Sequence, residues 1–190
     1  ANLMLIAGIA SDDGQQIVNS VKWNGTSLVF INSGQNLLNR ADQYYLVNPQ
    51  VGTFSLDIAW AGAVSDGSVI VSDFTGVAQF GPDANASSNG DSTGTGALSI
   101  TTSSDNSLIV DTFSSNQTPA TDVTAGSNQT LIKRFSPASA YTQATSYQGP
   151  VSPAGARNMV WTNANKRNWG EVRSVFAPVV SAAATEQQAA

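Results

Sequence analysis

The sequence predicts an all-β protein folded as an antiparallel β-sandwich, and three features support this fold class. In "TFSLDIAW" apolar residues recur at every second position, which is the pattern of a strand with one buried face. Similar apolar runs alternate with turn sequences rich in Gly, Asn, Asp and Ser along most of the chain. No amphipathic stripe is long enough to build a layer of helices.

Taken in order from the N-terminus, these runs predict a series of short strands with the spacing of a sandwich. The strands are expected at Leu3–Ala10, Ile17–Trp23, Ser27–Ile31, Gln43–Val47, Thr53–Trp60, Ser68–Phe74, Ala97–Thr102, Leu108–Phe113, Thr130–Phe135, Met159–Thr162 and Glu171–Phe176.

Two turns in this series have a clear chemistry. "NGT" after Trp23 predicts a tight hairpin turn, because Asn and Gly adopt positive φ at little cost. Pro49 cannot donate a ladder hydrogen bond and Gly52 tolerates positive φ, so Asn48–Gly52 is expected to join two paired strands as a hairpin.

Three other segments lack the strand pattern. Residues 81–96 and 114–129 consist of small polar residues, and both are expected to be long loops, either plain connections or binding surface. The segment 36–43, "NLLNRADQ", and the C-terminal end could each hold at most a helical turn.

The alternation also assigns side chains to faces. Every second residue from Phe54 to Trp60 is expected to face the core, whereas Ser55 and its alternating neighbours face outward. Tyr44 and Tyr45 are adjacent, so they point to opposite faces of their strand, and one of them is expected to be exposed. An exposed tyrosine here could stack on a sugar ring, which makes these two the candidate ligand-facing aromatics.

Composition limits the domain count and the partners. The chain has 190 residues, 41% of them hydrophobic, and no Cys, which suits one domain over residues 1–180 with an extended polar tail over 181–190. A net charge of −5 argues against nucleic acid and anionic membranes as partners, because both attract positive proteins. No apolar run approaches the roughly 20 residues needed to span a bilayer, so no membrane insertion is expected.

The sequence offers few groups for catalysis. With no His and no Cys, the commonest general base, metal ligand and nucleophile are all absent. Asp73 and Asp111 stand near the ends of apolar strands and could act as the carboxylate pair of a glycosidase, but such residues more often cap turns. Asp12 and Asp13 lack the spaced oxygens of a calcium loop. We therefore expect no enzyme activity, no cofactor and no metal site.

Several stretches together resemble a known module. "LMLIAGIASDDG", "VNSVKWNGTSL", "YYLVNPQVGTFSLDIAW", "VIVSDFTGVAQ", "NSLIVDTF" and "NMVWTNANKRNWGEVRSVFAPV" are similar to a jelly-roll, concanavalin-like β-sandwich that recurs in bacterial surface proteins and in phage virion and fibre proteins. The resemblance implies a structural or adhesive module without catalytic residues. It also implies an edge strand before "LMLIAGIA", and here the chain begins with that run.

These observations favour a non-enzymatic structural subunit of an extracellular, cell-surface or virion assembly, such as a fibre, filament or capsid-surface protein. Its partners would be copies of itself or another structural protein. The expected assembly edge is the first strand, at Leu3, Met4, Leu5 and Ile6, and the expected tail contacts are Ser181, Thr185 and Gln187. The alternative is a carbohydrate-binding or adhesion module that binds glycans through Tyr44 or Tyr45.

Overall fold

The structure, a computed structural model, describes residues 2–64, 66–91, 93–137, 141–165 and 167–179. These residues form antiparallel strands almost throughout, which confirms the all-β fold class. Within the described ranges the only helix is the single 3-10 turn η1 (Ala120–Asp122). No helix of these ranges has the length and apolar character needed to cross a membrane.

The strands form four sheets. The N-terminal inner sheet has the order β4 (Val29–Gln35), β5 (Arg40–Val47), β1 (Leu3–Ser11), β7 (Gly67–Thr75). The N-terminal outer sheet has the order β3 (Thr26–Ser27), β2 (Val18–Trp23), β6 (Leu56–Trp60). The C-terminal inner sheet has the order β12 (Thr130–Phe135), β13 (Thr142–Val151), β10 (Ser107–Ser115), β15 (Trp169–Phe176), β8 (Ala84–Gly90), and the C-terminal outer sheet β11 (Val123–Ala125), β14 (Gly155–Asn163), β9 (Thr95–Thr102).

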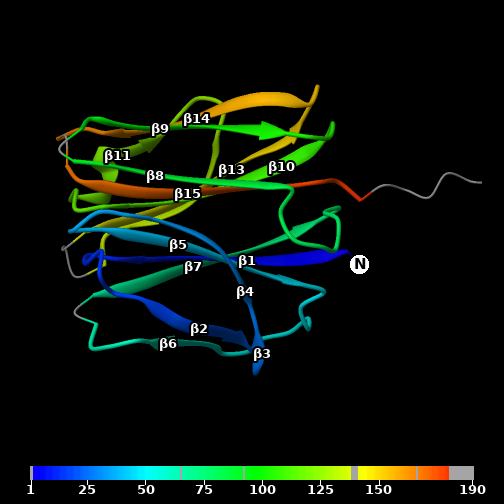
Figure 1. Cartoon of the computed structure of the whole chain (residues 1–190), viewed down its shortest axis with the longest axis horizontal. Helices are drawn as coiled ribbons and strands as arrows, with labels where there is room; N and C mark the ends of the chain where they lie inside the picture. The colour runs from blue at the N-terminus through cyan, green and yellow to red at the C-terminus, as the bar shows by residue number, and fades with distance from the viewer. Residues whose placement is uncertain (1, 65, 92, 138–140, 166, 180–190) are drawn as a thin grey trace, which may run out of the picture.

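The four sheets are stacked, with the two inner sheets facing each other in the middle (Figure 1). Strand β1 shows why the stack holds together, because both of its faces are apolar. Leu5, Ala7 and Ile9 pack toward the N-terminal outer sheet, whereas Met4 and Ile6 pack toward the C-terminal inner sheet. The third interface, between the two C-terminal sheets, is filled by two further apolar clusters. The β-sandwich expected from the sequence is therefore a stack of four sheets with three apolar interfaces.

The two halves of the chain repeat one arrangement of strands. The order β4-β5-β1-β7 of the N-terminal inner sheet returns as β12-β13-β10-β15 in the C-terminal inner sheet. The registers correspond as well, since each central strand pairs with a tyrosine on one side and a serine on the other. The partners of Ile6 in β1 are Tyr45 and Ser72, and those of Val110 in β10 are Tyr147 and Ser174.

Local irregularities repeat too. The pairing of β4 with β5 skips Ile31, and the pairing of β12 with β13 skips Ile132. In the outer sheets, β2 paired with β6 corresponds to β11 paired with β14. Because a bulge is a specific feature of a strand pair, its recurrence at the matching place supports a structural duplication.

Contacts between the halves are reciprocal, as expected for two copies related by an approximate two-fold axis. The ring of Tyr45 lies 6.3 Å from the ring of Phe176, and the matching pair, Tyr147 and Phe74, lies 5.7 Å apart. The segments that follow β7 and β15 are joined by an isolated β-bridge between Val77 and Pro178. These two residues occupy nearly matching places after the two strands.

Among the described residues, one feature occurs in the C-terminal half and not in the N-terminal half. Strands β8 and β9 and the turn between them, here called the 84–102 arch, place one strand in each C-terminal sheet. β8 pairs with the outer edge of β15, and β9 pairs with the outer edge of β14. In the N-terminal half, β7 and β6 correspond to β15 and β14, and each is the last strand of its sheet. The outer edges of β7 and β6 are therefore unpaired in the described part of the chain.

Two expectations about loops and turns were wrong. Residues 81–96 are not a loop, because most of them build the 84–102 arch. The segment 36–43, which could have held at most a helical turn, leads directly into β5 without one. Asn48 and Gly52 do have positive φ, at 46° and 150°, but the turn joins β5 to β6, which lie in different sheets, so no hairpin forms.

Other expectations were confirmed. Asn24 and Gly25 have positive φ in the hairpin between β2 and β3. In the run leading into β6, Phe54, Leu56, Ile58 and Trp60 are half-buried while the residues between them are exposed, so the predicted phase of the alternation is correct. The tail 181–190 lies outside the described residues.

Candidate functional site

The expected assembly edge is not an edge. Strand β1 is paired on both sides, so that Met4 lies opposite Val47 of β5 and also opposite Phe74 of β7. Met4 and Ile6 are fully buried, and the strand has no free backbone groups to offer a partner. The first strand therefore cannot act as the assembly edge. The expected tail contacts, Ser181, Thr185 and Gln187, lie outside the described residues.

The two candidate ligand-facing tyrosines belong to the core. They point to opposite faces as predicted, but the sheet that carries them is covered on both sides. Tyr44 is buried against the N-terminal outer sheet and its hydroxyl donates to the carbonyl of Val18. Tyr45 is half-buried against the C-terminal inner sheet. Neither ring is presented to a sugar.

Asp73 and Asp111 do not form a carboxylate pair. Asp73 is exposed on β7 and shares the face of its partner Leu5, which packs toward the N-terminal outer sheet. Asp111 is fully buried on β10 and contacts Trp161 of the C-terminal outer sheet. The two carboxylates face away from each other across two sheets, so they cannot flank one substrate bond.

Asp111 belongs to a buried charged cluster with Glu171 and Arg173, whose side chains are all fully buried. Its carboxylate accepts hydrogen bonds from Ser146 Oγ at 2.8 Å and Trp161 Nε1 at 3.0 Å. Arg173 Nε lies 3.6 Å from Asp111 Oδ2, and the Arg173 guanidinium also donates to Glu171.

Burial raises the pKa of Glu171 from an ordinary 4.5 to about 8, and only part of this rise is offset by the positive charge of Arg173. Burial likewise raises the pKa of Asp111, opposed by Arg173. One guanidinium thus faces two carboxyl groups, and a proton on Glu171 leaves the cluster electrically balanced. No cavity opens onto the cluster among those that the structure describes, so we assign it a structural role in the C-terminal half.

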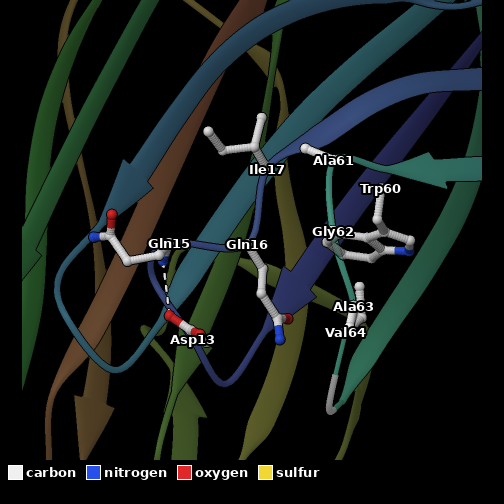
Figure 2. Close-up of a pocket in the computed structure, with 9 residues that line it drawn as sticks. All are labelled: Asp13, Gln15, Gln16, Ile17, Trp60, Ala61, Gly62, Ala63 and Val64. Atoms are coloured by element: carbon white, nitrogen blue, oxygen red, sulfur yellow. Dashed lines mark hydrogen bonds between the residues drawn. The ribbon is translucent and has the colours of Figure 1, made fainter.

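A small hollow of about 250 Å³ lies where β2 and β6 approach each other at the opposite end from the β2–β3 hairpin (Figure 2). Asp13 is its one charged residue. Its Oδ1 accepts a hydrogen bond from the Gln15 backbone at 2.8 Å, so it caps the turn. Among the described residues no group of three His, Cys, Asp or Glu could hold a metal ion. The hollow brings together no reactive groups.

The surface that does stand out is the unpaired edge of β7, which has a groove on each side. On the side of the C-terminal inner sheet, a groove of about 510 Å³ is lined by Val71–Thr75 together with Ile132 of β12 and Tyr147 of β13. On the side of the N-terminal outer sheet, a groove of about 230 Å³ includes Val71 and Asp73 again, with Leu3, Leu5, Trp23 and the turn 49–52. We call the two grooves and the β7 edge between them the edge groove.

The C-terminal half shows what fills the matching space. Alongside β15, strand β8 pairs with the backbone, and Asn85 Oδ1 accepts a hydrogen bond from Asn32 of β4, the counterpart of β12. Between the two C-terminal sheets, Ala84, Ala86 and Ile100 of the arch pack on buried core residues. In the N-terminal half the same positions form the edge groove.

The difference appears in the exposure of matching residues. Val71 of β7 lies opposite Ala7 of β1, and Arg173 of β15 lies opposite Asp111 in the same way. Val71 is 39% exposed, whereas Arg173 is fully buried. Every residue of β15 is buried, but β7 is buried only at Ile70.

Sequence reasoning missed the edge groove because it assigned the free edge to the wrong strand. A signal was present in the likeness of "SVIVSDF", residues 68–74, to "GEVRSVF", residues 170–176, and of "LDIAW" to "RNMVW" in the strands before them. Alignment of the two halves would have matched β7 with β15 and β6 with β14.

Comparison of the chain with protein-family models, with curated proteins and with solved structures gave no match.

Proposed function

We propose that the protein is a non-enzymatic structural subunit that assembles with other subunits by strand addition at the edge groove. The observation that carries this proposal is that the edges of β7 and β6 have no strand partner among the described residues. The edges of β15 and β14 are paired by the 84–102 arch, while the corresponding edges of β7 and β6 end their sheets. An unpaired strand presents a row of N–H and C=O groups that another strand can pair with.

The character of the sheet edges supports this assignment, because natural edge strands usually carry protection against pairing. Strands β3 and β11 have only two and three residues, and β4 and β12 carry register shifts. β12 also bears Lys133 and Arg134. By contrast β7 has nine residues, an uninterrupted register and neither Pro nor a basic residue. The edge of β7 is thus open and unprotected.

A carbohydrate-binding module is the second candidate function. It requires an exposed aromatic platform, and Tyr44 and Tyr45 do not supply one. A glycan array would test it independently of assembly. Specific glycan binding by a protein that stays monomeric would favour this candidate over the structural one.

The experiment that tests the structural proposal compares the β7 edge with an exposed turn. Val71 on β7 and Leu37 in the turn between β4 and β5 are both exposed, at 39% and 78%. Lys at an edge discourages pairing, so Val71→Lys should abolish concentration-dependent assembly in sedimentation velocity and electron microscopy. The matched control Leu37→Lys should assemble like the unchanged protein. A chain that stays monomeric at high concentration, or assembly that survives Val71→Lys, would contradict the proposal.

A further inference from the structure

We infer that the edge groove of one molecule receives the 84–102 arch of a second copy, so that subunits join head to tail. This inference rests on the proposed function and names its partner. In the contact, the outer edge of β8 in the second copy pairs with β7, and the outer edge of β9 pairs with β6. The arch would then lie between two molecules, bound to β15 and β14 of its own chain and to β7 and β6 of its neighbour.

The arch offers two strand edges that lie in adjacent layers. β8 pairs antiparallel with β15 from Trp169↔Gly90 to Val175↔Ala84, and β9 pairs with β14. β8 ends its sheet and β9 ends its sheet, so each has a second edge without a partner in the described residues. β7 and β15 run in the same direction, so matching the layers turns the second copy over and its β8 runs parallel to β7. Strands can pair in either direction at nearly the same spacing.

The layers of the two surfaces match. The free edges of β7 and β6 lie in adjacent stacked sheets, and the free edges of β8 and β9 lie in adjacent stacked sheets in the same relation. Pairing β7 with β8 therefore places β6 beside β9 without a change in sheet spacing. Both inner and outer sheets would continue from one molecule into the next.

The side chains of the arch and of the edge groove are also compatible. Ala84–Gly90 and Thr95–Thr102 contain no charged residue, no Pro and mostly small side chains. The edge groove is lined mainly by uncharged residues, with Asp73 as the one ionisable acid or base other than a tyrosine. A strand of Ala and Ser can enter such a groove without burying an unpaired charge. Neither β8 nor β9 has a register shift that would protect its edge.

The position of the two surfaces makes the assembly open-ended. Across the middle interface β8 packs on β4, at one end of the N-terminal inner sheet, whereas β7 is at the other end of that sheet. The arch and the edge groove thus lie on opposite sides of the molecule. A contact between two different surfaces on opposite sides does not close as a dimer, and repetition of it forms a filament.

The absence of Cys from the chain allows a direct test. Asp73 faces the N-terminal outer sheet, and Ala84, Ala86 and Ser88 share the face of β8 that points to the C-terminal outer sheet. In the head-to-tail contact these residues share one face of a continuous sheet. A protein with Asp73→Cys is mixed, under oxidising conditions, with proteins carrying Cys at one of the three β8 positions.

The expected result is a covalent heterodimer for at least one of the three β8 positions, because a disulfide requires Cβ atoms within about 4.5 Å. Ser87→Cys, on the opposite face of β8, is the matched control and should give none. Assembly without any such heterodimer, or a covalent homodimer of Asp73→Cys alone, would overturn the inference while leaving the proposed function in place. Absence of assembly at every concentration would overturn both.

Discussion

The N-terminal and C-terminal halves share a strand order and a register, yet they differ in how completely they are closed. β15 is buried along its whole length, because β10 and β8 flank it and sheets cover both faces. β7 has a partner on one side only and is buried only at Ile70. The 84–102 arch thus completes the C-terminal half, whereas the described residues hold no second arch for the N-terminal half.

The interiors of the two halves also differ. The positions taken by Asp111, Glu171 and Arg173 in the C-terminal half correspond to Ala7, Val69 and Val71 in the N-terminal half. An apolar set and a charged set thus occupy the same part of the same architecture. Because the charged set is fully buried, its contribution to stability depends on its partners and on pH, whereas the apolar set has no titratable group.

The largest difference between the halves is expected for their outer-sheet tryptophans. Trp161 of β14 is fully buried, its ring stacks on that of Phe113 with centroids 5.5 Å apart, and it donates a hydrogen bond to Asp111. Trp161→Ala should lower the free energy of unfolding by about 3–5 kcal/mol. Trp60 of β6 is only half-buried, so Trp60→Ala should cost about 1–2 kcal/mol. Urea unfolding measures both, and equal losses would refute the contrast between the halves.

A second difference is expected in the pH dependence of stability. The pKa of Glu171 is about 8 in the folded protein and near 4.5 when unfolded, so the folded state binds the extra proton between these values. The contribution of Glu171 to stability is complete below about pH 4.5 and is lost as the pH rises toward about 8. Glu171→Gln should flatten this part of the pH profile of the melting temperature.

The control for that profile comes from the other half. Val69 corresponds to Glu171, so Val69→Ala should lower stability by the same amount at every pH between 4.5 and 8. If the melting temperature of Glu171→Gln changes with pH as steeply as that of the unchanged protein, another group causes the pH dependence.

The smallest effect is expected along β6, where it tests the phase of the strand. Ile58 packs on the N-terminal core from a half-buried position, whereas Ser55 is exposed in the segment before β6. Ile58→Ala should cost about 1–2 kcal/mol, below the range for fully buried sites, because part of the side chain is already in water. Ser55→Ala should change stability by less than about 0.5 kcal/mol. Thermal unfolding that gives similar values for both would contradict the assigned phase.

Strands with apolar alternation could be predicted well from the sequence. Thr130–Phe135 matches β12 end to end, and the run leading into β6 has the predicted phase. Strands β8 and β13 could not be found this way, because Ala, Ser, Thr and Gln occupy their inward positions. In β13 the buried Gln143 donates to the Gly8 carbonyl and accepts from Ser68 Oγ, so hydrogen bonds replace the apolar pattern.

The candidate site was harder to predict than the strands. The continuous apolar run "LMLIAGIA" is typical of a strand buried on both faces, and its assignment to an edge was therefore wrong. Local turn chemistry around Asn48 could not reveal that the next strand joins another sheet. Which edge stays unpaired depends on the pairing of distant segments, and only the three-dimensional comparison of β7 with β15 identifies it.

Strand addition at the edge groove is tested most directly by hydrogen–deuterium exchange of the full chain at low and at high protein concentration. Backbone amides that gain a strand partner exchange more slowly. Amides of β7 and of the 84–102 arch should gain protection at high concentration, while those of the central strands β1 and β10, which are paired on both sides within one molecule, should not change. Assembly that leaves the exchange of β7 and of the arch unchanged would contradict strand addition at this edge.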